Sequence, residues 1–199
     1  MKKFVNFLSA FRIFAAFALI PTIMFQMFWL TFVMYVLAAV SDFFDGYLAK
    51  KYKVTSKIGG VLDHIGDKLL VVNTMILLTI MMPVWFVLIP VILMVARELY
   101  ISGLREFLGT QKIEMPVPAG RFSMGKIKTT LQMVAIGAFL LMFALGASLT
   151  PNMTSRILMY AIYFLPFIGV GLLWLSLLAS LWSATEYTKT FIEKFKKIK

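Results

Sequence analysis

The chain has 199 residues, of which 61% are hydrophobic and only 15% are charged, and its mean hydropathy is +0.89. Soluble domains are about 45–50% apolar and about 25% charged, so a soluble globular protein and a disordered chain are both excluded as first hypotheses. The absence of cysteine and the single histidine, His64, exclude disulfides, thiolate metal sites and a three-histidine zinc site. The chain has twenty basic and nine acidic residues. In a membrane protein, such an excess of positive charge first indicates the orientation in the membrane and contact with anionic headgroups, and only then the charge of a substrate. We expect no nucleic-acid partner.

Four long stretches carry no charged residue: 13–41, 69–96, 129–155 and 157–185. A membrane-spanning helix needs about 20 residues, so each of the last two stretches predicts one span. If each of the first two also held a single span, the protein would have four spans. The lysine-rich loop between the first two would then face outside, against the positive-inside rule.

The first two stretches each contain a turn signal near the middle, Pro21-Thr22 in one and Met82-Pro83 in the other. When each stretch is read as a helical hairpin, nearly all Lys and Arg residues fall on one side of the membrane. The six predicted spans are roughly 4–24, 27–49, 59–82, 84–106, 123–149 and 154–183. The sequence therefore predicts an all-α integral membrane protein with six transmembrane helices and with both termini cytoplasmic.

The residues after the last span form a short basic segment. In residues 186–199, lysines alternate with aromatic and aliphatic residues, which fits either an amphipathic helix at the membrane interface or a solvated tail. We divide the chain into a transmembrane domain, 1–185, and this amphipathic C-terminal tail, 186–199.

Four aspartates lie at the predicted cytoplasmic ends of the second and third spans. Asp42 and Asp45 are three residues apart, and Asp63 and Asp67 are four apart, so each pair shares a helix face. A short loop joins the two spans, so we expect antiparallel neighbours whose four carboxylates converge at the membrane edge. Such a cluster either protonates or binds hard divalent cations through oxygen, and two ions would balance its charge.

Two other interpretations of the aspartates stay open. Lysines nearby could pair with them as purely structural salt bridges; these are Lys50, Lys53, Lys57 and Lys68. The aspartates could also be the ion site of a divalent-cation transporter, although transporter sites usually lie near the middle of the membrane.

The aspartates are part of a longer pattern. It reads D-x2-D-G-x2-A-K from Asp42 to Lys50 and, after eight further residues, G-x3-D-x3-D from Gly59 to Asp67. This pattern resembles the signature of the CDP-alcohol phosphatidyltransferases at seven of eight fixed positions. The departure is Lys50, where the family has Arg; the charge is kept, but the two-pronged guanidinium is lost.

Further motifs resemble the branch of this family that uses sn-glycerol 3-phosphate as acceptor, the phosphatidylglycerophosphate synthases. They lie at residues 6–12, which end in Arg12, and at 67–70, 97–107 and 125–132. The resemblance implies a six-helix membrane bundle with a polar cavity open to the cytoplasm, usually a homodimer, in the bacterial cytoplasmic membrane. It implies transfer of the phosphatidyl group of CDP-diacylglycerol to sn-glycerol 3-phosphate. The nearest alternatives are sister enzymes with another acceptor, cardiolipin synthase or phosphatidylinositol phosphate synthase.

The resemblance also implies roles for individual residues. Two divalent ions, Mg²⁺ or Mn²⁺, would be held by Asp42, Asp45, Asp63 and Asp67, and Asp67 is the candidate general base. The pocket for CDP-diacylglycerol would be lined by Asn6, Gly46, Ala49, Lys50, Ser56 and Gly59.

The acceptor phosphate needs fixed cations, and the sequence supplies four candidates: Arg105, Arg121, Lys126 and Lys128. Each could instead be a positive-inside charge that contacts lipid headgroups. Lys126 and Lys128 are two residues apart and cannot share a helix face, so we expect only Lys128 to point into the cavity.

Overall fold

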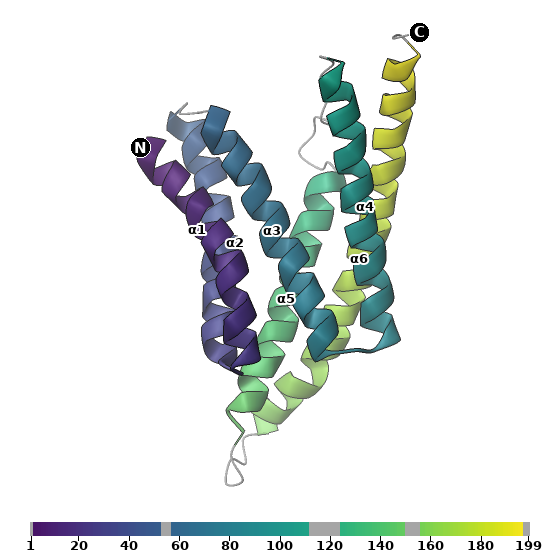
Figure 1. Ribbon diagram of the computed structural model, residues 1–199. Coiled ribbons are helices and arrows are strands. Elements are labelled where there is room, and N and C mark those ends of the chain that lie inside the picture. Colours follow the sequence, from purple (N-terminus) through teal and green to yellow (C-terminus); the bar gives the residue numbers. More distant parts are fainter. Residues whose placement is uncertain (1, 53–56, 112–123, 150–155, 197–199) are drawn as a thin grey trace. The chain divides into compact units, whose positions relative to one another are not determined.

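The computed structural model of the protein is all-α. It describes residues 2–52, 57–111, 124–149 and 156–196, without the side chains of residues 2–6, 43–52, 57 and 58. Six helices follow one another in this part of the chain (Figure 1): α1 Lys2–Met24, α2 Phe28–Tyr52, α3 Lys57–Met81, α4 Trp85–Thr110, α5 Met124–Ala147 and α6 Arg156–Phe195. The predicted all-α class is confirmed, and the described residues form the six helices that the sequence predicted.

Five of these helices, all except α2, are long and apolar enough to cross a membrane. In α2, the apolar stretch among the described residues is shorter and covers Phe28–Asp42. Many large apolar side chains point outward, among them Phe14, Leu178 and Trp182, which are each more than half exposed. A surface of this kind is stable in lipid and not in water, so the protein is a multi-pass membrane protein.

The predicted hairpin at the start of the chain agrees with the structure, because α1 ends at Met24 and α2 begins at Phe28, close to the predicted bounds 4–24 and 27–49. Pro21, part of the turn signal, lies inside α1. The backbone N–H of Met27 then donates to the carbonyl of Thr22 at 2.8 Å, and Gln26 has a φ of 56°. A left-handed residue with such a bond back into the last turn is a common helix end. The other predicted turn, at Met82-Pro83, is confirmed, because α3 ends at Met81 and α4 begins at Trp85.

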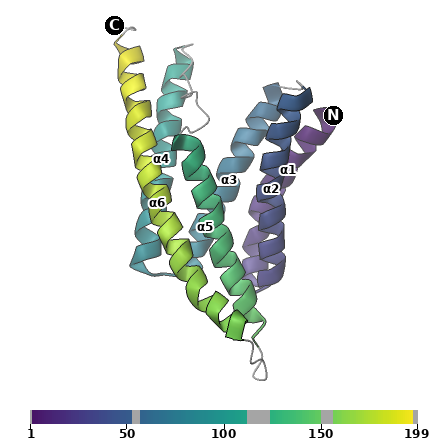
Figure 2. The ribbon, with the colours of Figure 1, turned by 180° about the vertical axis from the view of Figure 1, so that it is seen from behind.

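The chain divides into two compact units, Met1–Met82 with Met133–Gly169, and Pro83–Gln132 with Val170–Lys199. In the first unit, α1 packs against both α2 and α3 (Figures 1 and 2). Its small residues Ala15 and Ala16 are fully buried, which lets the neighbouring helices approach. Among the described residues, α2 also contacts α3, but both of these helices pack more extensively against α1 than against each other.

In the same unit, α2 is also bonded to Met133 of α5 and to Ser148, which directly follows that helix. The Tyr35 hydroxyl donates to the carbonyl oxygen of Met133 at 3.0 Å, and the Trp29 indole N–H donates to the Ser148 hydroxyl at 2.6 Å. These bonds satisfy polar groups that lipid cannot satisfy.

In the second unit, α4 and the later part of α6 lie side by side (Figures 1 and 2). Four of the buried apolar residues of α4 recur every seven positions: Val87, Met94, Ile101 and Leu108. On α6, the buried residues include three serines: Ser176, Ser180 and Ser183. A seven-residue spacing is typical of helices that pack along one continuous seam, and small residues let such helices approach closely in membranes.

Helix α6 is unusually long, with 40 residues. At about 1.5 Å per residue it measures about 60 Å, roughly twice the hydrocarbon thickness of a bilayer. It continues without a break from the predicted sixth span into residues 186–195, where Phe191 and Phe195 contact Phe107 of α4. The separation of a tail at residue 186 stays a prediction.

Gly66 of α3 lies where α1 and α3 come close together. A Cβ atom at this position would lie 3.3 Å from the Ser9 carbonyl oxygen and 3.4 Å from the Cβ of Arg12, both on α1. Gly60, on the same helix, is exposed and has no atom within 4 Å of the corresponding point.

We predict that Gly66→Leu destabilises the protein, because the new side chain must push α1 away from α3. Overpacking of this kind costs about 1–3 kcal/mol. The measurement is the thermal unfolding midpoint of the purified protein in detergent. Gly60→Leu is the matched control, since it has the same change in helix propensity and no neighbour to displace. Equal midpoints for the two variants would contradict the prediction.

Candidate functional site

Three of the predicted aspartates meet in the first unit. Asp63 and Asp67 lie one turn apart on α3, and Asp42 lies on α2. One carboxylate oxygen of each lies within 4.8 Å of the other two. The structure therefore brings these three residues together from two helices. The fourth, Asp45, lies on α2, but its side chain is outside the described part of the structure.

The three carboxylates share one partner, Arg12 of α1. Its Nη1 donates to Asp42 Oδ1 at 2.9 Å and also to Asp67, and its Nη2 donates to Asp63 Oδ1 at 2.9 Å. The Arg12 side chain is 0% exposed, whereas those of the three aspartates are 31–45% exposed. A fully buried cation in an apolar helix is stable only when it is paired, and these bonds pair it.

The same three residues fit a divalent cation. Carboxylate oxygens are the ligands that Mg²⁺ and Mn²⁺ prefer, and the spacing of the three allows one ion to reach all of them. One guanidinium against three carboxylates leaves a net charge of −2, so the group still attracts cations.

Of the residues predicted to line the nucleotide pocket, few can be placed in detail. Asn6 lies on α1, and Gly46, Ala49 and Lys50 lie on α2, with side chains outside the described part. Gly59 is buried in the first turn of α3, one turn before Asp63. Ser56 lies outside the described residues.

The basic residues predicted for the acceptor phosphate have different surroundings. On α5, Lys126 is exposed, whereas Lys128 is 6% exposed. This difference agrees with the expectation that the two lysines point in different directions. Arg105 is on α4 and is partly buried, and Arg121 lies outside the described residues.

Lys128 belongs to a network in the second unit that joins α4, α5 and α6. Its Nζ is paired with Glu98, which also accepts a bond from Arg97 at 3.1 Å. Arg97 donates further to the Ser180 carbonyl oxygen at 3.1 Å and to the Ser183 hydroxyl at 3.0 Å. Glu98 therefore lies between two buried cations and fixes the position of both.

Tyr187 of α6 adds an aromatic contact to this network. Arg105 donates to its hydroxyl at 2.9 Å, and the guanidinium carbon atoms of Arg105 and Arg97 lie 5.0 and 5.9 Å from its ring centre. Such cation–π contacts stabilise cations that have lost water. Three cations, Arg97, Arg105 and Lys128, thus contact one carboxylate and one phenol, so the network has an excess of positive charge.

Three residues of these networks have no predicted role: Arg12, Glu98 and Tyr187. A signal for Arg12 exists, because it lies in a helix of apolar residues, and a charge in such a place requires a partner. Its partners were not predictable, since they lie 30 to 55 residues away in the chain.

Comparison with known proteins agrees with the signature. Residues 3–182 match the family described as CDP-alcohol phosphatidyltransferase. Curated relatives named CDP-diacylglycerol–glycerol-3-phosphate 3-phosphatidyltransferase include proteins from Cereibacter sphaeroides, 45% identical over 115 residues, and Rickettsia bellii, 44% identical over 108 residues. The protein of the same name from Escherichia coli is 35% identical over 150 residues.

These alignments differ in extent. They cover 57%, 54% and 75% of this chain, respectively. The chain spans about half the length of the first two relatives, 50% and 56%, and 71% of the third.

Proposed function

The chain belongs to the CDP-alcohol phosphatidyltransferase family, and from this premise we propose that it transfers a phosphatidyl group from CDP-diacylglycerol to sn-glycerol 3-phosphate. The products would be phosphatidylglycerophosphate and CMP. The names of the bacterial relatives support this choice of acceptor. The observation that carries the proposal is the meeting of Asp42, Asp63 and Asp67, all in the family signature, around one point.

We assign the metal site to the four signature aspartates. Asp42, Asp45, Asp63 and Asp67 would hold two divalent ions, Mg²⁺ or Mn²⁺. When bound, such ions neutralise phosphate oxygens and stabilise the charge that develops during phosphoryl transfer.

In the transfer step, the primary hydroxyl of the acceptor attacks the β-phosphorus of CDP-diacylglycerol. A new P–O bond forms as the bond between this phosphorus and the bridging oxygen breaks, and CMP leaves with that oxygen. Asp67, as general base, takes the proton of the hydroxyl. The donor's cytidine diphosphate is bound by Asn6, Gly46, Ala49, Lys50, Ser56 and Gly59 in this proposal.

The acceptor is a phosphate dianion, and we assign its binding to Arg105, Arg121, Lys126 and Lys128. The burial of Lys128 and the partial burial of Arg105 support this part of the proposal, because cations that have lost part of their water shell bind phosphate strongly. The phenol of Tyr187 and the carboxylate of Glu98 hold these two cations in fixed positions.

The distribution of Lys and Arg supports a topology for the proposed enzyme. Six spans with both termini cytoplasmic place nearly all basic residues on one side, and a polar cavity open to the cytoplasm would admit the water-soluble acceptor. The bacterial sources of the relatives support a location in the bacterial cytoplasmic membrane. A homodimer is part of the proposal by family resemblance.

An acceptor panel tests the proposed function. The purified protein is mixed with CDP-diacylglycerol, Mg²⁺ or Mn²⁺, and one acceptor at a time: sn-glycerol 3-phosphate, phosphatidylglycerol or inositol phosphate. CMP release is expected with sn-glycerol 3-phosphate. Release only with another acceptor would identify a sister enzyme, and no release with any acceptor would contradict the proposal.

We predict that Asp67→Asn lowers CMP release by at least about a hundredfold, because a positioned base contributes about 10²–10⁴-fold. Mn²⁺ binding should be largely kept, since the other aspartates remain. The measurements are CMP release and Mn²⁺ titration on the same preparation. Glu193→Gln, an exposed acid on α6, is the control for loss of one negative charge. Near-normal turnover of Asp67→Asn would exclude Asp67 as the base.

We also predict that Lys128→Gln raises KM for sn-glycerol 3-phosphate about ten- to a hundredfold, with little change in KM for the donor. A charge-assisted hydrogen bond contributes about 1.5–3 kcal/mol, and about 1.4 kcal/mol corresponds to a factor of ten. Lys126→Gln is the matched variant and should have a much smaller effect, because Lys126 is exposed. An unchanged acceptor KM in Lys128→Gln would indicate that these lysines only orient the protein in the membrane.

A further inference from the structure

We propose that Arg12 is a positioning residue of the carboxylate group, and that it competes with divalent cations for the same three aspartates. In this proposal, its guanidinium holds Asp42, Asp63 and Asp67 together and gives up bonds to them when metal ions bind. The inference rests on the proposed function, because it concerns the metal ions of that reaction.

Arg12 lies on the helix that packs against both helices carrying the aspartates. Asp42 is on α2 and Asp63 and Asp67 are on α3, and among the described residues each of these helices packs more extensively against α1 than against the other. Both pack against α1, and Arg12 of α1 bonds to all three carboxylates. Arg12 is therefore the direct link between the aspartates of the two helices.

The negative charges of the three aspartates need a nearby cation. Three carboxylates with oxygens within 4.8 Å of one another repel strongly, and repulsion of this kind either protonates them or draws in a cation. Arg12 provides that cation from within the chain, and it is fully buried beside them. The close approach of α1 to α3 depends on Gly66, because a glycine has no Cβ atom and leaves room for the Cβ of Arg12.

The guanidinium of Arg12 and a metal ion would bind the same carboxylate groups. Arg12 is bonded to an Oδ1 atom of each aspartate, and the metal ligands would be carboxylate oxygens of these residues. A divalent ion that approaches meets a positive charge already bonded to every one of them. Binding of the ion must therefore weaken or break bonds that Arg12 makes, and this opposes metal affinity.

The test compares Mn²⁺ affinity in the wild type, Arg12→Lys and Arg12→Gln, measured by titration of each protein in detergent without substrates. Arg12→Gln has lost the competing charge, and Arg12→Lys keeps a charge but cannot donate from two nitrogen atoms at once. We expect Arg12→Gln to bind Mn²⁺ at least about tenfold more tightly than the wild type, because each charge-assisted bond is worth about one factor of ten or more. Arg12→Lys should lie between the two.

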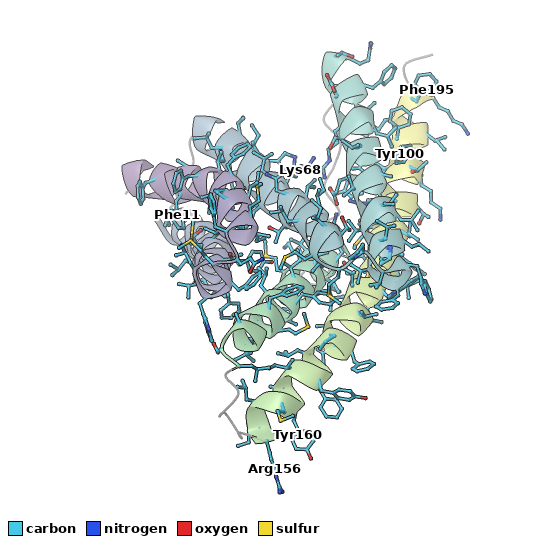
Figure 3. The ribbon with its side chains drawn as sticks, turned by 60° about the horizontal axis from the view of Figure 1, so that its bottom comes forward. Phe11, Lys68, Tyr100, Arg156, Tyr160 and Phe195 are labelled. Atoms are coloured by element: carbon cyan, nitrogen blue, oxygen red, sulfur yellow. The ribbon has the colours of Figure 1, made fainter. Side chains whose placement is uncertain are left out.

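Thermal unfolding in EDTA and in Mn²⁺ is the second measurement. Without divalent ions, Arg12→Gln should unfold at a lower temperature than the wild type, and Mn²⁺ should stabilise it more than it stabilises the wild type. Arg156→Gln is the matched control, since Arg156 is exposed at the start of α6 and points away from it (Figure 3). This variant should behave like the wild type in both measurements.

Weaker or unchanged Mn²⁺ affinity in both Arg12 variants would overturn the proposal, because a residue that only supports the metal ligands loses affinity when it is removed. If Arg12→Gln does not fold, the order of Arg12→Lys and the wild type decides. CMP release by the wild type distinguishes a failure of this inference from a failure of the proposed function. An active, metal-dependent wild type with the wrong order of affinities contradicts only the inference, whereas a wild type that releases no CMP contradicts the proposed function.

Discussion

The structure of the first unit depends on how a charged group is buried in an apolar helix. Arg12 is fully buried, and a cation in such a place must be paired if the helix is to be stable in the membrane. Its three carboxylate partners are on two other helices, so pairing the charge also fixes how α1, α2 and α3 pack. The same contacts collect the aspartates on which the proposed chemistry depends. The bonds that stabilise the helix packing therefore also bring these carboxylates together.

The second unit buries its charges in a similar way, with the signs reversed. Here one carboxylate, that of Glu98, is shared by two buried cations, Arg97 and Lys128. The first unit has an excess of negative charge around its shared partner, and the second has an excess of positive charge. Each of these two environments is built from residues on several helices of its own unit.

Sequence reasoning predicted the helices well and their contacts less well. The apolar stretches and the turn at Met82-Pro83 gave the six helices, and the spacing of Asp63 and Asp67 gave a shared helix face. The first turn also lies where the predicted spans 4–24 and 27–49 place it, although Pro21 itself lies inside α1. The role of Arg12 could not be predicted, since hydropathy identifies a helix and does not identify which helix pairs with it.

The short connection between α1 and α2 has a consequence for the length of both helices. Arg12 and Asp42 lie at nearly equal distances along the chain from Gln26, so at about 1.5 Å per residue they reach the same height on the two arms of a hairpin. One residue inserted in either arm between them would turn the side chain beyond it by about 100° and break this match. Changes of side chain can be tolerated along the lipid-facing sides of these arms, whereas changes in their length cannot. The number of residues between Arg12 and Asp42 therefore decides whether their side chains can meet. We expect substitutions in this hairpin to be tolerated more readily than insertions or deletions.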